Sequence, residues 1–152
     1  MTGIIGAFAG ALGFACMYNL SGRNLWLAAF NGMTGQIVYV LAKAADWNEF
    51  AAMAAASLTV TLLAELLARI FRSPVTAYLV CALIPLVPGK GIFEAIRCWI
   101  LDYADAATWA RFTFLQGTGI AAGCLIAAGF VRTLARYRKQ KEAGGRLKQK
   151  SK

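Results

Sequence analysis

The 152-residue chain contains no histidine, only three prolines and only seven acidic residues. Histidine is the commonest general base and the commonest metal ligand, so its absence argues against a hydrolase and against a metal centre. The cysteines do not compensate, because each lies in a different apolar segment and no CxxC pair occurs. These four residues are Cys16, Cys81, Cys98 and Cys124. We therefore expect no metal, no other cofactor and no enzymatic activity.

Apolar residues are abundant, at 59% of the chain against 15% charged residues. The mean hydropathy of +0.57 is far above that of a soluble domain. A chain of this length holds four or five spans of about 20 residues each and almost no soluble domain. We predict an all-α integral membrane bundle of about five transmembrane segments. The predicted spans are residues 2–20, 25–42, 50–71, 75–101 and 110–131, within a membrane domain of residues 1–135.

Positive charge is concentrated at the C-terminus. The formal net charge is +9, and nine of the basic residues lie in residues 132–152 beside a single acidic one, Glu142. Basic residues follow the cytoplasmic ends of membrane spans, so we predict that residues 136–152 form a cytoplasmic tail that does not bind nucleic acid. Five spans then put the N-terminus on the outer side of the membrane. The loop charges agree, with Arg23, Arg69 and Arg72 inside and Asp46, Glu49, Asp102 and Asp105 outside.

The fourth predicted span carries two prolines and a glycine, in the run Leu83-Ile84-Pro85-Leu86-Val87-Pro88-Gly89. Each proline lacks a backbone N–H and crowds the preceding turn, so a helix should break here. In hydrocarbon the freed carbonyls cannot reach water, so such a break persists only when it is buried in protein or lines a polar cavity. Transporters hold their substrates at breaks of this kind. We therefore predict a discontinuous crossing helix and a substrate site at Pro85, Pro88 and Gly89.

A new half-helix should begin after Gly89, and its first N–H groups favour a carboxylate. Lys90 adds a full positive charge there, and Glu94 and Arg97 follow on the same helical face. In the functional interpretation, Lys90 or Arg97 meets a substrate carboxylate, while Glu94 binds a substrate ammonium group or a proton. In the alternative, this half-helix lies at the outer interface, where the three residues form screened ion pairs of little energy.

Polar residues in the other spans are secondary candidates for lining the route or for coupling. They are Asn31, Thr34, Gln36, Glu65 and Gln116. Hydrogen bonds between helices explain the amides and Thr34 equally well. Glu65 has an alternative as well, because Arg69 lies four residues further on and predicts a structural ion pair.

Two small-residue motifs, Gly6-x-x-x-Gly10 and Gly119-x-x-x-Gly123, predict close helix packing. They also carry the alternative function, a non-transporting membrane scaffold or assembly partner that packs through its glycine-rich faces. In that interpretation the proline break is only a kink in the helix.

Several stretches resemble the bacterial threonine/serine exporter (ThrE) superfamily. In the fourth segment they are Ala82-Leu83-Ile84-Pro85-Leu86-Val87-Pro88-Gly89, preceded by Ala64-Glu65-Leu66-Leu67-Ala68-Arg69 and Pro74. Nearer the N-terminus they are Phe14-Ala15-Cys16-Met17-Tyr18-Asn19, Arg23-Asn24-Leu25, Gly32, Gly35 and Tyr39, which resemble the short subunits of that family. The similarity covers nearly all of residues 5–135.

The resemblance implies the small subunit of a secondary exporter, embedded in the lipid bilayer beside a larger membrane subunit. The implied substrate is a small carboxylate, either threonine or serine or a dicarboxylate such as succinate. Family members carry a tyrosine shortly after the Pro-Gly break where this chain has Phe93, so one hydroxyl group is missing. No glycine-rich GK[ST] loop occurs, so an ion gradient or the substrate's own gradient must drive transport. Assembly with further copies of the chain is an open alternative.

Overall fold

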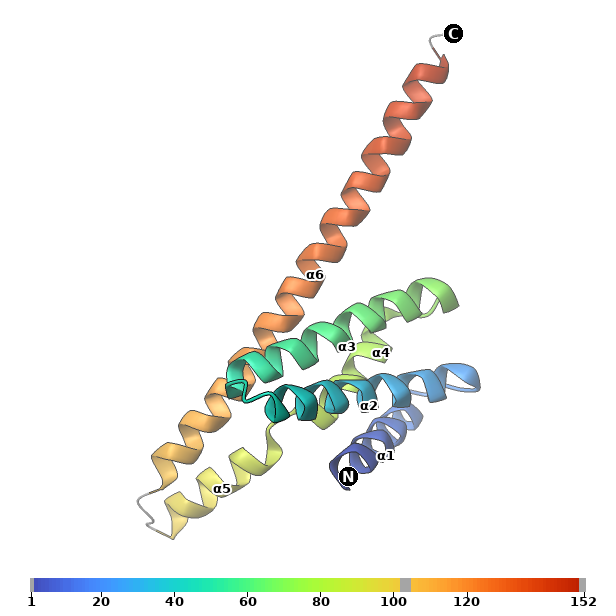
Figure 1. Cartoon of the computed structure of the whole chain (residues 1–152). Coiled ribbons are helices and arrows are strands. Elements are labelled where there is room, and N and C mark those ends of the chain that lie inside the picture. The colour runs from blue at the N-terminus through green and yellow to red at the C-terminus, as the bar shows by residue number, and fades with distance from the viewer. Residues whose placement is uncertain (1, 102–104, 151–152) are drawn as a thin grey trace.

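The computed structural model describes the backbone of residues 2–101 and 105–150, with the side chains of those ranges apart from residues 2, 135 and 138–150. All regular structure in these ranges is helical, as predicted (Figure 1). The elements are α1 (Thr2–Met17), α2 (Arg23–Ala44), α3 (Glu49–Phe71), α4 (Val75–Leu83), a 3-10 turn η1 (Ile84–Leu86), α5 (Gly89–Ile100) and α6 (Ala106–Lys150). Their order matches the five predicted segments, with α4, η1 and α5 together forming the fourth.

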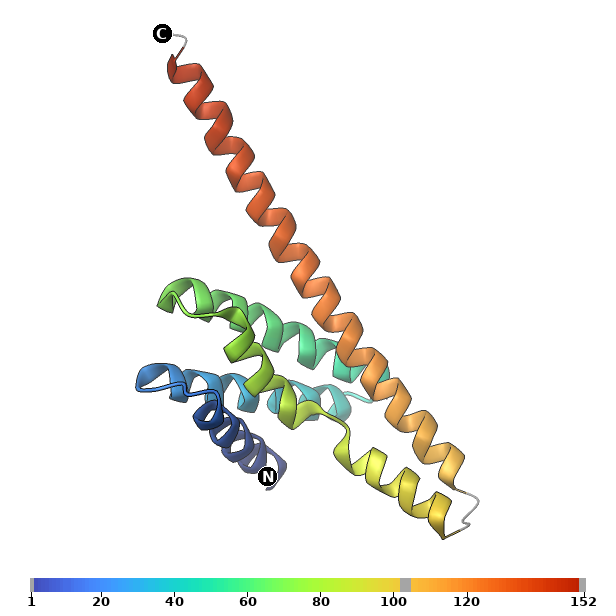
Figure 2. The same ribbon diagram turned by 180° about the vertical axis from the view of Figure 1, so that it is seen from behind.

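The α2–α3 hairpin is the centre of the bundle. Helix α1 packs against α2, α4 packs against both α2 and α3, and α6 crosses α3 (Figures 1 and 2). Helix α5 leaves the bundle after the break and lies alongside the first turns of α6. The C-terminal part of α6 continues as one helix far beyond the other elements, so the predicted tail region is helical up to Lys150.

Three helices in the described residues are long and apolar enough to cross a bilayer: α2, α3 and residues Ala106–Leu134 of α6. The α4–η1 segment and α5 make a fourth span if they are counted together, with a bend of 45° between them. Helix α1 is apolar but has only 16 residues. At 1.5 Å per residue it reaches about 24 Å, short of a hydrocarbon core of about 30 Å. A crossing by α1 therefore stays a prediction.

Small side chains fill the centre of the bundle. Tyr78 and Cys81 of α4 are fully buried where α1, α2 and α3 meet. The residues packed around them are Ala15, Ala28, Ala64 and Ala68. Alanines at these contacts let the helix backbones approach closely, which is how helices associate inside a membrane.

The Gly119-x-x-x-Gly123 motif packs α6 onto α3, as predicted. A Cβ atom on Gly119 would lie 2.6 Å from the carbonyl oxygen of Phe50, and one on Gly123 would collide with the Ser57 hydroxyl. Only a residue without a side chain allows the two helices to cross at this distance.

Two of the glycines of α1 are open on the surface of the described residues. A Cβ atom on Gly6 or Gly13 would meet nothing in the described residues within 4 Å. Helix α1 instead turns Ala7, Ala11 and Ala15 toward the bundle, and all three are buried. Of the predicted Gly6-x-x-x-Gly10 pair, only Gly10 faces another element of the described residues, with an added Cβ atom 4.0 Å from the Pro85 ring, and the buried alanines make the close contacts of α1.

The basic and acidic loops lie at opposite ends of the bundle. The Arg23 guanidinium lies 4.6 Å from the ring centroid of Phe71, and the Asn24 amide donates to the Ser73 hydroxyl at 3.1 Å. These contacts join the α1–α2 and α3–α4 connections at one end, while the α2–α3 loop with Asp46 lies at the other (Figure 1). The charge asymmetry used to predict the orientation is therefore a feature of the folded bundle.

Candidate functional site

The chain breaks at the residues that the sequence indicated. Helix α4 cannot continue through Pro85, and the chain forms one 3-10 turn before Pro88 precedes α5. The Val87 N–H donates to the Ile84 carbonyl at 3.1 Å, and the Gly89 N–H donates to the Val87 carbonyl at 2.7 Å. The turn therefore satisfies its own donors without water, as an interruption at membrane depth requires.

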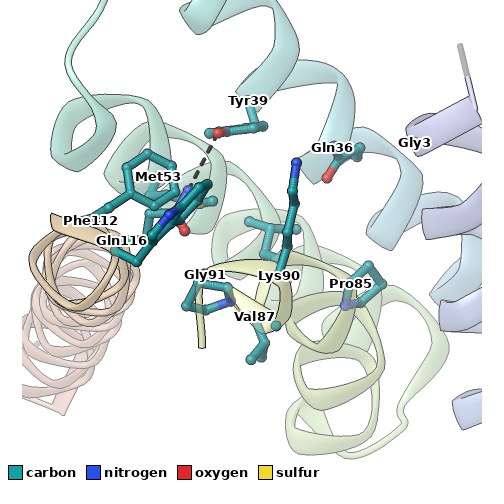
Figure 3. A pocket seen from close by; sticks show the side chains of 14 residues that line it. Gly3, Gln36, Tyr39, Met53, Pro85, Val87, Lys90, Gly91, Phe112 and Gln116 are labelled. Carbon is teal, nitrogen blue, oxygen red and sulfur yellow. Dashed lines mark hydrogen bonds between the residues drawn. The ribbon is translucent and has the colours of Figure 1, made fainter. Parts of the chain in front are cut away.

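A cavity of about 570 Å³ lies directly beside this break (Figure 3). Every helical element except α4 contributes to its wall. The lining residues are Gly3, Gln36, Tyr39, Met53, Pro85, Leu86, Val87, Pro88, Gly89, Lys90, Gly91, Trp109, Phe112 and Gln116. The wall is apolar apart from a few polar side chains, which is the usual composition of a small-molecule site.

The start of α5 supplies positive charge to the cavity. Lys90 is the only charged residue among the described lining residues, and its side chain points across the cavity toward Gln36 and Tyr39 (Figure 3). No carboxylate in the described ranges forms an ion pair with it. After the Gly89 N–H, which is held by the Val87 carbonyl, the next N–H of α5 that reaches back to a carbonyl is that of Ile92, which donates to Pro88 at 3.0 Å. The N–H groups of Lys90 and Gly91 are therefore available to an anion, with the helix dipole behind them.

Helix α6 holds α5 in this position. A Cβ atom on Gly91 would collide with the Thr113 hydroxyl, so the two helices touch at the first turn of α5. The rings of Trp109 and Phe112, edge to face at 5.9 Å between centroids, form the apolar side of the cavity next to this contact. The break and α6 thus shape the cavity together.

The wall opposite α5 is held by a carboxylate that lies just outside the cavity. Asn48 caps α3 by accepting the Ala51 N–H at 2.7 Å, so Glu49 is the first residue of that helix. The Tyr39 hydroxyl donates to Glu49 at 3.0 Å and the Gln116 amide donates to the same oxygen at 3.1 Å. Lys43 forms an ion pair with the other oxygen at 2.6 Å. One carboxylate thereby joins α2, α3 and α6 at the edge of the cavity.

A protein-family model described as Threonine/Serine exporter, ThrE, matches residues 3–130 of the chain. The chain belongs to this family. The match includes all the residues that line the cavity and the whole of the broken helix. Membership makes the chain a membrane protein of the threonine/serine exporter type, and its apolar helices agree with that. Searches of curated proteins and of solved structures find no match.

The structure brings six of the predicted site residues of this exporter-family chain into one cavity. Four of them, Pro85, Pro88, Gly89 and Lys90, come from the break itself. The other two, Gln36 and Gln116, come from α2 and α6 and were only secondary candidates in the sequence.

Glu94 and Arg97, also predicted for the site, lie outside the cavity lining. They form an ion pair with each other at 3.1 Å, and the Arg97 side chain is 54% exposed. Their geometry is that of the alternative interpretation, in which the residues on this face of α5 form surface ion pairs.

The remaining candidates make contacts within or between helices. Asn31 is buried and donates to the Val60 carbonyl at 3.2 Å, and Thr34 donates to the Phe30 carbonyl one turn earlier at 2.7 Å. Glu65 pairs with Arg69 at 3.7 Å on α3, away from the cavity lining. Asn31 and Glu65 make the structural contacts that the sequence left open as alternatives, whereas Thr34 bonds within its own helix and not to a neighbouring one.

Sequence reasoning missed the wall formed by Tyr39, Glu49, Trp109 and Phe112. The Tyr39 and Glu49 side chains are joined across a short loop, and Lys43 at the end of α2 with Glu49 at the start of α3 is only a weak local signal for contacts across that loop. Gln116 lies 67 residues from Glu49 along the chain, so nothing in the sequence announces their contact.

Proposed function

We propose that this chain is the small subunit of a secondary exporter for small carboxylate metabolites, and that the cavity at the helix break holds the substrate. The observation that carries the proposal is the position of Lys90. Its side chain points into a cavity of about 570 Å³ and has no carboxylate partner in the described residues. It also lies next to the free N–H groups at the start of α5. Charge and donors of this kind bind a carboxylate.

Two substrate classes fit a carboxylate site of this size. Threonine and serine are those named by the family, and a dicarboxylate such as succinate also presents the required group. The apolar side of the cavity, with Met53, Trp109 and Phe112, would contact the carbon skeleton of either. The GK[ST] pattern of a nucleotide-binding loop does not occur in the sequence, so transport follows an ion gradient or the substrate's own gradient.

The exporter that we propose has a second, larger membrane subunit. Known secondary transporters place their sites between two structural repeats, and the five helical segments here do not contain an independent pair of repeats. The proposed setting is the bacterial inner membrane, with residues 1–135 as the membrane domain, the N-terminus outside and residues 136–152 in the cytoplasm. The gathering of Arg23 and Arg72 at one end of the bundle supports that orientation.

Efflux of labelled threonine, serine and succinate from cells tests the proposal, with the chain expressed alone and beside the larger subunit. We expect efflux only when both subunits are present. Lys90→Gln should lower it by about tenfold or more, because a charged hydrogen bond to the substrate carboxylate is lost. Arg97→Gln is the matched control, because it removes a positive charge from α5 outside the cavity. Normal efflux in a correctly inserted Lys90→Gln variant would contradict the proposed site.

The open glycine face of α1 favours the second candidate, a membrane scaffold. A neighbouring helix could approach Gly6 and Gly13 closely, because nothing in the described residues covers them. In that case Gly6→Leu should prevent co-purification with the larger subunit, while Lys90→Gln should leave both assembly and efflux unchanged.

A further inference from the structure

We infer that Glu49 is a positioning residue: it holds the donor groups of Tyr39 and Gln116, so that both side chains present hydrogen-bond acceptors to the cavity. The wall that they form recognises the ammonium or hydroxyl donors of the substrate. The inference rests on the proposed role of the cavity as a carboxylate-substrate site. It adds a second recognition wall, opposite the one formed by Lys90.

The argument begins with what a carboxylate can do. An ionised carboxylate only accepts hydrogen bonds, so each group that contacts Glu49 must turn a hydrogen toward it. One oxygen receives the Tyr39 hydroxyl at 3.0 Å and the Gln116 amide nitrogen at 3.1 Å. The other oxygen is 2.6 Å from the Lys43 ammonium group, and the Glu49 side chain is only 15% exposed. The donors of Tyr39 and Gln116 therefore point away from the cavity.

The hydrogen-bond acceptors of Tyr39 and Gln116 therefore remain free to bind a ligand. The single hydrogen of the Tyr39 hydroxyl is held by Glu49, so the phenolic oxygen can offer only a lone pair to the cavity. Gln116 lines the cavity and is only 5% exposed. Its amide nitrogen donates a hydrogen bond to Glu49 and a second one, at 3.5 Å, to the Tyr39 hydroxyl oxygen. Its amide oxygen accepts no hydrogen bond from the described residues. Figure 3 shows the Gln116 and Tyr39 side chains meeting at one edge of the cavity, with the Lys90 side chain pointing past that edge between Tyr39 and Gln36.

The cavity is therefore polarised. The start of α5 donates hydrogen bonds and carries positive charge, while the Tyr39–Gln116 wall accepts hydrogen bonds. Because Lys43 neutralises Glu49, the accepting wall selects by hydrogen-bond direction and not by net charge. A molecule with a carboxylate at one end and an ammonium or hydroxyl donor at the other satisfies both walls. A dicarboxylate would bring its second carboxylate against acceptors and leave them unpaired, and sites of this type discriminate strongly against such a ligand.

The test measures how well unlabelled compounds inhibit labelled threonine transport in membrane vesicles that contain the complete exporter. The competitors are serine, butyrate, which is threonine without its amino and hydroxyl groups, and succinate. For the native protein we expect serine to compete at least about tenfold better than either of the others, the value of one charge-assisted hydrogen bond. In Glu49→Gln the new amide can donate to Tyr39 and free the tyrosine hydrogen for the cavity, so this preference should fall by a similar factor. The same change at Glu65, which pairs with Arg69 on the same helix, is the control and should leave the preference unchanged.

Tyr39→Phe provides an independent variant, because it removes the accepting oxygen and leaves the Lys43–Glu49 ion pair in place. It too should reduce the preference for serine over butyrate. If both variants weaken all competitors by the same factor, Glu49 only stabilises the bundle and the inference is wrong. Native transport of succinate but not of threonine would also overturn it, while leaving the carboxylate site intact. The carboxylate site itself fails separately, if Lys90→Gln leaves the transport of every compound unchanged.

Discussion

Adding one methyl group to a glycine of α6 tests the contact between α6 and α3 most directly. A Cβ atom on Gly119 would lie 2.6 Å from the Phe50 carbonyl oxygen and 3.0 Å from the Met53 Cβ atom. Ordinary carbon contacts lie at about 3.5–4.0 Å, so the two helices must separate by close to 1 Å. The obstructing atoms belong to the backbone and to a Cβ atom, which cannot move by changing a rotamer.

We expect Gly119→Ala to lower the free energy of unfolding by about 1–3 kcal/mol, the usual cost of overpacking a close contact. Gly129→Ala is the matched control on the same helix, because a Cβ atom there meets nothing in the described residues within 4 Å. That variant should be neutral or more stable by up to about 1 kcal/mol, the difference in helix propensity between glycine and alanine. The two variants should therefore shift stability in opposite directions.

The assay is unfolding of the purified protein in mixed detergent micelles, followed by the loss of helix signal. A transport measurement adds a second readout, because Gln116 lies one turn before Gly119 and must move with α6. Similar stabilities for Gly119→Ala and Gly129→Ala would refute the reasoning, since α6 would then not rest on α3 at this distance.

Three further outcomes follow from the same structure. Pro88→Ala restores an N–H at the start of α5 and should reduce efflux while the protein still inserts, whereas unchanged efflux would mean that the break is only a kink. Arg69→Gln should change the free energy of unfolding by less than about 1 kcal/mol, because its ion pair is half exposed; a larger loss in thermal denaturation would contradict this. With the four native cysteines replaced, Asp46→Cys should react with an impermeant thiol reagent on intact cells and Arg72→Cys only after permeabilisation, and the reverse pattern would invert the proposed orientation.

The sequence predicted the features that depend on neighbouring residues. Pro85 and Pro88 remove N–H groups and crowd the preceding turn, so the break in the fourth segment followed from local chemistry alone. The packing of Gly119 and Gly123 could be predicted for a similar reason, because residues four apart share a helix face. The membrane fold likewise followed from composition, and the exporter family from the resemblance of the run around the break to that family.

The sequence could not predict which helix faces meet. It placed Lys90, Glu94 and Arg97 on one face of a helix, but the bend at the break turns only Lys90 into the cavity. It likewise predicted a packed glycine stripe on α1, although Gly6 and Gly13 are open in the described residues and buried alanines make the close contacts.

The accepting wall of the cavity was decided only by the tertiary structure. Tyr39, Glu49 and Gln116 come from three helices, and Gln116 lies 77 residues from Tyr39 in the sequence. Local periodicity fixes each helix and the direction of its side chains relative to its own axis. The rotation of one helix against another depends on the packing of all of them at once, and that rotation determines which polar atoms share a cavity.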